Sequence, residues 1–176
     1  MRRIMPKRIA VLLTHHFDDK EYAESVHAFR AARHTITNID THAGKVVHGQ
    51  QYRENVTIDK SIDDVSPHDF DALLIPGGNS PSHLRLDERF VNFVRHFANL
   101  YKPIFCICSA PLLLIDANVV KGRRLTTQDH VSDDLIQAGA VYLNEAVVND
   151  NNLYISSRST TDLGAFIHES LNVLKQ

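Results

Sequence analysis

Short apolar runs alternate with helix-like patterns along most of this chain. Runs that are continuously apolar or rich in β-branched residues predict buried strands over residues 8–14, 35–39, 70–75 and 103–107. Apolar residues at helical spacing predict helices over residues 18–33, 88–101 and 110–115. Residues 45–58 predict a short hairpin, and less regular segments continue the alternation at residues 125, 131–138, 141–142, 153–156 and 161–174.

This alternation predicts an α/β protein with a doubly wound, mostly parallel sheet and helices on both faces. The length of 176 residues, without internal repeats or linkers, favours a single domain over residues 1–176. In such sheets ligands bind beyond the carboxyl ends of the strands. The loops expected there are residues 15–19, 76–82 and 108–111.

Composition narrows the classes of partner. The net charge is −2, with 19 basic and 21 acidic residues spread along the chain, so neither nucleic acid nor an acidic membrane is an expected partner. No apolar run is long enough for a membrane span or a signal peptide. The two cysteines, Cys106 and Cys108, would lie roughly 6.6 Å apart on a strand, which disfavours a disulfide. A reducing, cytoplasmic location is therefore expected.

Cys108 follows the strand at residues 103–107 and precedes Ser109, Ala110 and Pro111. Small residues and a proline suit a sharp turn from a strand into a helix. At the start of a helix a thiolate is favoured, so Cys108 is expected to react as a thiolate below pH 7, whereas Cys106 is expected to react hardly at all. The alternative is that Cys108 is a buried cysteine at the end of a core strand, and these residues alone do not separate the two.

The other two loops supply candidate partners for this sulfur. The N–H of Gly78, in a Pro-Gly-Gly turn, and the N–H of Ser109 are candidates for an oxyanion hole. A protonated Asp18 can donate a hydrogen bond to the sulfur, although Asp18 and Glu21 also fit a helix capping box, which is the better interpretation from sequence alone. The two roles of Asp18 are compatible.

The chain has eleven histidines, of which His15, His16 and His130 are expected near the strand ends. They are candidate auxiliary acids, most plainly His16 and His130, but solvated loop histidines are the more common case. A metal site built from Cys106, Cys108 and these histidines is disfavoured, because Cys-x-Cys on a strand lacks the spread of a tetrahedral site. No metal or other cofactor is expected.

Several segments together resemble the PfpI branch of the ThiJ/PfpI superfamily, in the family's order and over nearly the whole chain. They are residues 17–22 (FDDKEY), 73–78 (LLIPGG), 102–108 (KPIFCIC), 121–126 (KGRRLT), 138–140 (AGA) and 156–158 (SSR). The resemblance implies a flavodoxin-like fold and self-association as dimers or hexamers. It also implies a stress-linked protein of the intracellular cysteine peptidase, glyoxalase or deglycase kind.

The resemblance places the family's nucleophile on Cys108 and its oxyanion glycine on Gly78. Three positions depart from the family's pattern: Ser109 replaces the histidine after the nucleophile, Asp18 replaces the glutamate at the thiol, and Ser82 replaces an acidic residue that a neighbouring subunit contributes. Since Ser109 cannot act as a base near neutral pH, chemistry on a small carbonyl or acyl group fits better than peptide hydrolysis.

Two functions follow from this pattern. The first is a cysteine-dependent hydrolase, glyoxalase or deglycase acting on a small carbonyl or peptide-like substrate, with Cys108 as nucleophile and Asp18 as proton shuttle. The second is a non-catalytic stress protein in which Cys108 is a redox sensor or has lost turnover. A glutaminase domain is set aside, because His168-Glu169 lacks the required His-x-Glu spacing.

Overall fold

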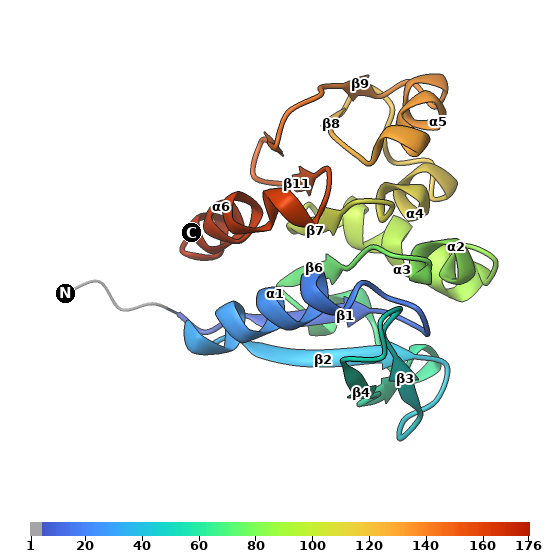
Figure 1. The fold of residues 1–176 in the computed structure, drawn as a ribbon, viewed down its shortest axis with the longest axis vertical. Helices are drawn as coiled ribbons and strands as arrows, with labels where there is room; N and C mark the ends of the chain where they lie inside the picture. The colour runs from blue at the N-terminus through green and yellow to red at the C-terminus, as the bar shows by residue number, and fades with distance from the viewer. Residues whose placement is uncertain (1–4) are drawn as a thin grey trace.

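A computed structural model describes residues 5–176 and contains a central sheet of seven strands in the order β10-β11-β7-β6-β1-β2-β5 (Figure 1). Its pairs are parallel except for β10, which runs antiparallel to β11 at one edge. The strands are β1 (Arg8–Leu12), β2 (Thr35–Asp40), β5 (Lys60–Ser61), β6 (Ala72–Ile75), β7 (Ile104–Ile107), β10 (Val147–Asp150) and β11 (Tyr154–Ser157).

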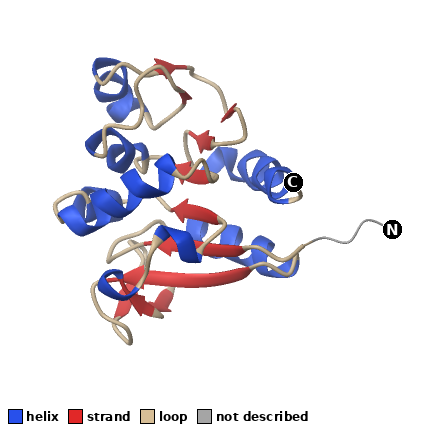
Figure 2. Ribbon diagram, turned by 180° about the vertical axis from the view of Figure 1, so that it is seen from behind, coloured by secondary structure: helices blue, strands red, loops and turns tan. Residues whose placement is uncertain are grey.

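Helices cover both faces of this sheet, and Figure 2 shows the strands between them. The helices are α1 (Asp19–Ala31), α2 (Ser80–Leu84), α3 (Glu88–Asn99), α4 (Pro111–Asp116), α5 (Ser132–Gln137) and α6 (Leu163–Leu174). Alternate residues of each central strand point to opposite faces. One face packs against α2 to α5 and the other against α1 and α6, which gives two hydrophobic clusters instead of one. The predicted doubly wound α/β fold is confirmed.

The remaining strands form two small sheets outside the central one. β3 (Val46–His48) and β4 (Asn55–Thr57) pair antiparallel, which confirms the predicted hairpin, and Val47 and Val56 pack it on the α1 face. β8 (Arg124–Leu125) pairs in parallel with β9 (Val141–Tyr142). Four short 3-10 helices connect these elements: η1 (Ile62–Asp64), η2 (Pro67–Asp69), η3 (Asp129–Val131) and η4 (Thr160–Asp162).

The predicted elements differ from the observed ones mainly at their ends. The first strand ends at Leu12 instead of residue 14, and the last helix begins at Leu163 instead of residue 161, after η4. Apart from the short 3-10 helices, three elements were not predicted: the short helix α2 and the edge strands β5 and β10. Between residues 5 and 176, no helix combines the length and the apolar character that crossing a bilayer requires.

The carboxyl ends of β1, β6 and β7 lie side by side because the three strands are parallel neighbours. Their loops are joined directly: Phe17 and Gly78 form an isolated antiparallel bridge, and the Asp18 N–H donates to the carbonyl of Gly77 at 3.0 Å. The sheet thus brings the three predicted loops together, as parallel α/β sheets do at their functional edge.

Candidate active site around Cys108

Cys108 occupies the predicted sharp turn between β7 and α4. Its φ is +62°, a left-handed conformation that costs a residue with a side chain about 1–2 kcal/mol. Hydrogen bonds hold the turn on both sides: the Cys108 N–H donates to the carbonyl of Ser157 at 3.0 Å, and its carbonyl accepts from Thr127 Oγ1 at 2.7 Å and from the Gln128 N–H at 3.0 Å. In this turn Cys108 is partly buried: it packs against the cluster under α1 and α6 and also borders a surface pocket.

The Gly77-Gly78 turn lies directly against this sulfur, and its geometry requires both glycines. A Cβ on Gly77 would stand 2.6 Å from Cys108 Cβ and 2.7 Å from Glu21 Oε1. Gly78 has φ +83°, and a Cβ there would stand 2.6 Å from the Asp18 backbone nitrogen. The Ser109 hydroxyl donates to the Gly78 carbonyl at 2.7 Å, which fixes the turn. Because glycine has no side chain, backbone N–H groups can approach the sulfur here.

The carboxyl group that acts most strongly on the thiol comes from Glu21, which was predicted only as part of the helix cap, and not from Asp18 as predicted. Glu21 is fully buried; its Oε1 accepts the Gly77 N–H at 2.9 Å and its Oε2 accepts from Thr160 Oγ1 at 3.0 Å. Burial, followed by the nearby charge of Asp18, raises the pKa of Glu21 to about 7. Near neutral pH this carboxyl therefore exists in both protonation states.

Asp18 caps α1, since its Oδ1 accepts the Glu21 N–H at 2.9 Å. The cap, which the sequence favoured, is confirmed. The reciprocal half of the capping box is not formed, because the side chain of Glu21 turns inward to Gly77 and Thr160. Asp18 lines the pocket that contains the sulfur, and its Oδ2 is 3.3 Å from Thr160 Oγ1.

The expected low pKa of Cys108 is wrong in direction. Burial, followed by the negative charge of Glu21, raises the pKa of this thiol to about 12, although the N–H groups of Gly78 and Ser109 act in the opposite sense. Helix α4 contributes little, because it spans only residues 111–116 and begins at a proline that has no N–H. Instead, Cys108 Sγ donates to Gln128 Oε1 at 3.0 Å, so the resting group is a thiol.

The sulfur opens into a pocket of about 330 Å³. Its lining contains Cys108, Gly78, Ser109, Asp18, Ser82, Gln50, Asn79, Gln128, His130, Ser159, Thr160 and Thr161. Four of these residues also line an adjoining hollow of about 510 Å³: Gln128, His130, Ser159 and Thr161. That hollow is completed by Asp129, Asn144, Arg158 and Asp162, so every side chain around it is polar.

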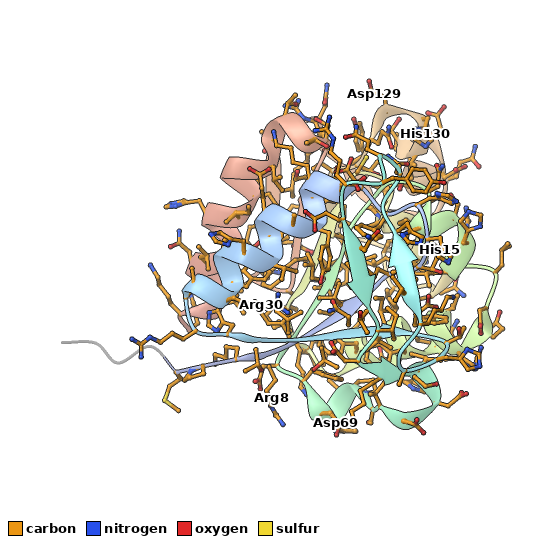
Figure 3. All side chains as sticks on the ribbon, turned by 60° about the horizontal axis from the view of Figure 1, so that its bottom comes forward. Arg8, His15, Arg30, Asp69, Asp129 and His130 are labelled. Atoms are coloured by element: carbon orange, nitrogen blue, oxygen red, sulfur yellow. The ribbon has the colours of Figure 1, made fainter. Side chains whose placement is uncertain are left out.

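The candidate histidines divide into two groups. His130 lines the Cys108 pocket and projects beside Asp129 from the segment before α5 (Figure 3). His16, in contrast, is absent from the pocket lining, and its ring lies against the rings of His15, Tyr52 and His83. Of the two auxiliary candidates, only His130 therefore lines the pocket that contains the sulfur.

Cys106 lies on β7 within the cluster under α2 to α5, where no surface is exposed. Burial raises its pKa to about 12, and neither cysteine forms a disulfide. Within residues 5–176, no group of three or more His, Cys, Asp or Glu side chains is placed to hold a metal ion.

The fold and this pocket define an α/β protein whose cysteine sits in a strained strand-to-helix turn, flanked by a Gly-Gly loop and a buried carboxyl. A family model described as the DJ-1/PfpI family matches residues 7–173. This chain belongs to the DJ-1/PfpI family.

Two relatives match this chain over nearly its whole length. The chain is 48% identical to protein/nucleic acid deglycase 2 of Escherichia coli, over 97% of this chain and 99% of the relative. It is 46% identical to general stress protein 18 of Bacillus subtilis, over 98% and 100%. A solved structure from Anabaena variabilis, a protein with DJ-1/ThiJ/PfpI-like and ferritin-like domains, matches with a TM-score of 0.92 at 28% identity; the match covers 96% of this chain and 48% of that chain.

Proposed function

We propose that this protein is a cytoplasmic enzyme that acts on small carbonyl compounds or on their adducts, as a glyoxalase or deglycase, with Cys108 as the nucleophile. The observation that carries the proposal is the arrangement of three groups around one sulfur: the N–H groups of Gly78 and Ser109 and the buried carboxyl of Glu21. The 48% identity to a deglycase supports the same choice of reaction.

In the proposed reaction the Cys108 sulfur adds to the carbonyl carbon. The new S–C bond forms as the C=O π pair moves to oxygen, and the N–H groups of Gly78 and Ser109 are placed to stabilise that oxyanion. The S–H proton passes to the ionised carboxylate of Glu21, which becomes neutral. A carboxyl with a pKa of about 7 suits this exchange, because it gains and loses a proton with little cost near neutral pH.

The altered positions favour carbonyl chemistry over peptide hydrolysis. Peptide cleavage requires an acid to protonate the leaving amine, and Ser109 donates its hydroxyl hydrogen to the Gly78 carbonyl. An aldehyde has no such leaving group. The adjoining polar hollow, which shares Gln128 and His130 with the Cys108 pocket, offers space for the hydrophilic part of a larger adduct.

The redox-sensor alternative gains no specific support. Oxidation and nucleophilic attack both follow the thiolate character of a cysteine, and burial together with Glu21 raises the pKa of Cys108. The enzyme proposal differs because Glu21 takes the S–H proton during the addition, whereas no group is proposed to do so for a sensor. We also propose, on the family resemblance, that the chain associates with itself as a homodimer or hexamer. A mass of twice or six times the chain mass in light scattering would support this proposal, and the mass of a monomer at working concentration would reject it.

The test is consumption of methylglyoxal by the wild type and by Cys108→Ser. The proposal expects a Cys108-dependent loss of the aldehyde, with the rate in the variant reduced to the uncatalysed level. Equal rates in the two proteins would reject it. Circular dichroism of the variant serves as the folding control.

A further inference from the structure

Thr160 links two carboxyl groups that differ in exposure. Its Oγ1 lies 3.0 Å from Glu21 Oε2 and 3.3 Å from Asp18 Oδ2. Glu21 is fully buried, whereas Asp18 is half-buried and lines both the Cys108 pocket and a second hollow of about 520 Å³ on the α1 surface. Asp18 and Glu21 lie at the start of α1, and Thr160 lies in η4. Glu21 and Thr160 are 139 positions apart in the sequence.

A single hydroxyl cannot serve both carboxylates at once. It has one hydrogen to donate and two lone pairs that accept. When Glu21 is ionised, Thr160 donates to it. When Glu21 is protonated, its O–H can donate to Thr160 Oγ1, while the Thr160 O–H donates to Asp18 Oδ2. Both contacts are then satisfied by one chain of hydrogen bonds that runs from the buried carboxyl to the exposed one.

We propose that Thr160 and Asp18 form a proton relay that connects the buried carboxyl of Glu21 to solvent, with Thr160 as its positioning residue. The proposal rests on the proposed role of Glu21 as the acceptor of the Cys108 proton. In each transfer Glu21 gives its proton to Thr160 Oγ1, the Thr160 hydrogen moves to Asp18 Oδ2, and Asp18 releases a proton to water. Thr160 then has its original composition, and the net change is one proton moved from Glu21 to water.

The relay meets a need that the pocket itself creates. Glu21 packs under the Gly77 turn and does not line the pocket, so water in the pocket has no direct access to its carboxyl. The ionisable groups that face Glu21 are Asp18, from its own helix cap, and Cys108, from the turn after β7. Of these two, Asp18 is the one placed to exchange protons with solvent, because Cys108 is the group that delivers the proton.

The experiment compares Thr160→Val, which removes the hydroxyl at nearly constant shape, with Thr160→Ser, which keeps it. Methylglyoxal turnover is measured in weak buffer, over a pH series, and with added imidazole as an external proton carrier. Thr160→Val is expected to lower kcat by at least about tenfold, with imidazole restoring much of the loss, and to move the pH profile upward because the carboxylate of Glu21 loses a hydrogen bond. Thr160→Ser is expected to restore both the rate and the profile.

Asp18→Asn separates the relay from simple electrostatics. It keeps the helix cap but removes a negative charge beside Glu21, so the pH profile should move downward while kcat in weak buffer still falls. A full rate in Thr160→Val, or a loss that imidazole does not change, would overturn the relay even if Cys108→Ser is inactive. If the wild type shows no Cys108-dependent turnover, the proposed function fails, and infrared titration of the Glu21 carboxyl decides the link to Thr160: an unshifted titration in Thr160→Val overturns it.

Discussion

Cys106 and Cys108 are the same residue type, two positions apart on one strand and the turn that follows, yet they occupy opposite environments. Cys106 has no exposed surface and contacts the Ile155 carbonyl at 3.8 Å within the core. Cys108 has a left-handed backbone, faces a pocket of about 330 Å³, and donates its S–H to Gln128. Burial raises the pKa of both thiols to about 12.

Access and neighbouring groups distinguish the two sulfurs, whereas the pKa of the thiol does not. Only Cys108 has backbone amides and an exchangeable carboxyl within reach. A charge that forms there during a reaction meets hydrogen-bond donors already in place. The same charge on Cys106 would meet the Ile155 carbonyl oxygen, which is itself an acceptor, and the apolar side chains of the cluster.

The largest expected difference is catalytic. Cys108→Ser should lower carbonyl turnover on the order of a thousandfold or more, because a serine hydroxyl without a strong base is a poor nucleophile. Cys106→Ser should leave kcat within a factor of about two and cost about 1 kcal/mol or more of stability, because it buries a hydroxyl in an apolar cluster. Steady-state kinetics and thermal unfolding of both variants measure the contrast. Similar activities in the two variants would remove the distinction.

A second prediction concerns the glycine that separates Cys108 from Glu21. Gly77→Ala should destabilise the protein by about 3 kcal/mol or more, since its Cβ would stand 2.6 Å from Cys108 Cβ and 2.9 Å from the Ile107 carbonyl oxygen. Gly164→Ala is the matched control: nothing lies within 4 Å of a Cβ there, within α6, so that variant should gain about 0.5–1 kcal/mol. Chemical denaturation measures both. A neutral Gly77→Ala would contradict the close packing of the turn.

Glu21→Gln should stabilise the protein progressively as the pH rises. The folded-state pKa of Glu21 lies above its usual value of 4.5, at about 7, so the stability of the wild type relative to this variant is greatest below 4.5 and is lost as the pH rises through 7. Between pH 4.5 and 8 the free energy of unfolding of Glu21→Gln should therefore rise by up to about 3 kcal/mol relative to that of the wild type. Glu24→Gln, at an exposed position of the same helix, should show no comparable growth. Unfolding of the wild type and of both variants at several pH values measures this change in stability.

Much of this architecture was predictable, because buried parallel strands leave continuous apolar runs such as residues 70–75 and 103–107. The turn at Cys108 was also predictable from the small residues and the proline that follow it. Glu21 was missed, since a cap motif explained it locally. The spacing along the helix indicated its burial, because Glu21 lies on the same face of α1 as Ser25 and Phe29, which are both buried. The direction of the Cys108 pKa was not predictable, because it depends first on how deeply the fold buries the thiol and then on a carboxyl 87 residues away in sequence.

The most direct test of the account is site-resolved alkylation of Cys106 and Cys108 with iodoacetamide, followed by mass spectrometry over a pH series, in the wild type and in Glu21→Gln. We expect folded protein to be labelled at Cys108 and hardly at Cys106. We also expect faster labelling of Cys108 in Glu21→Gln near pH 8, about tenfold for each unit by which losing the negative charge lowers the thiol pKa. Equal labelling of the two cysteines, or an unchanged rate in Glu21→Gln, would contradict it.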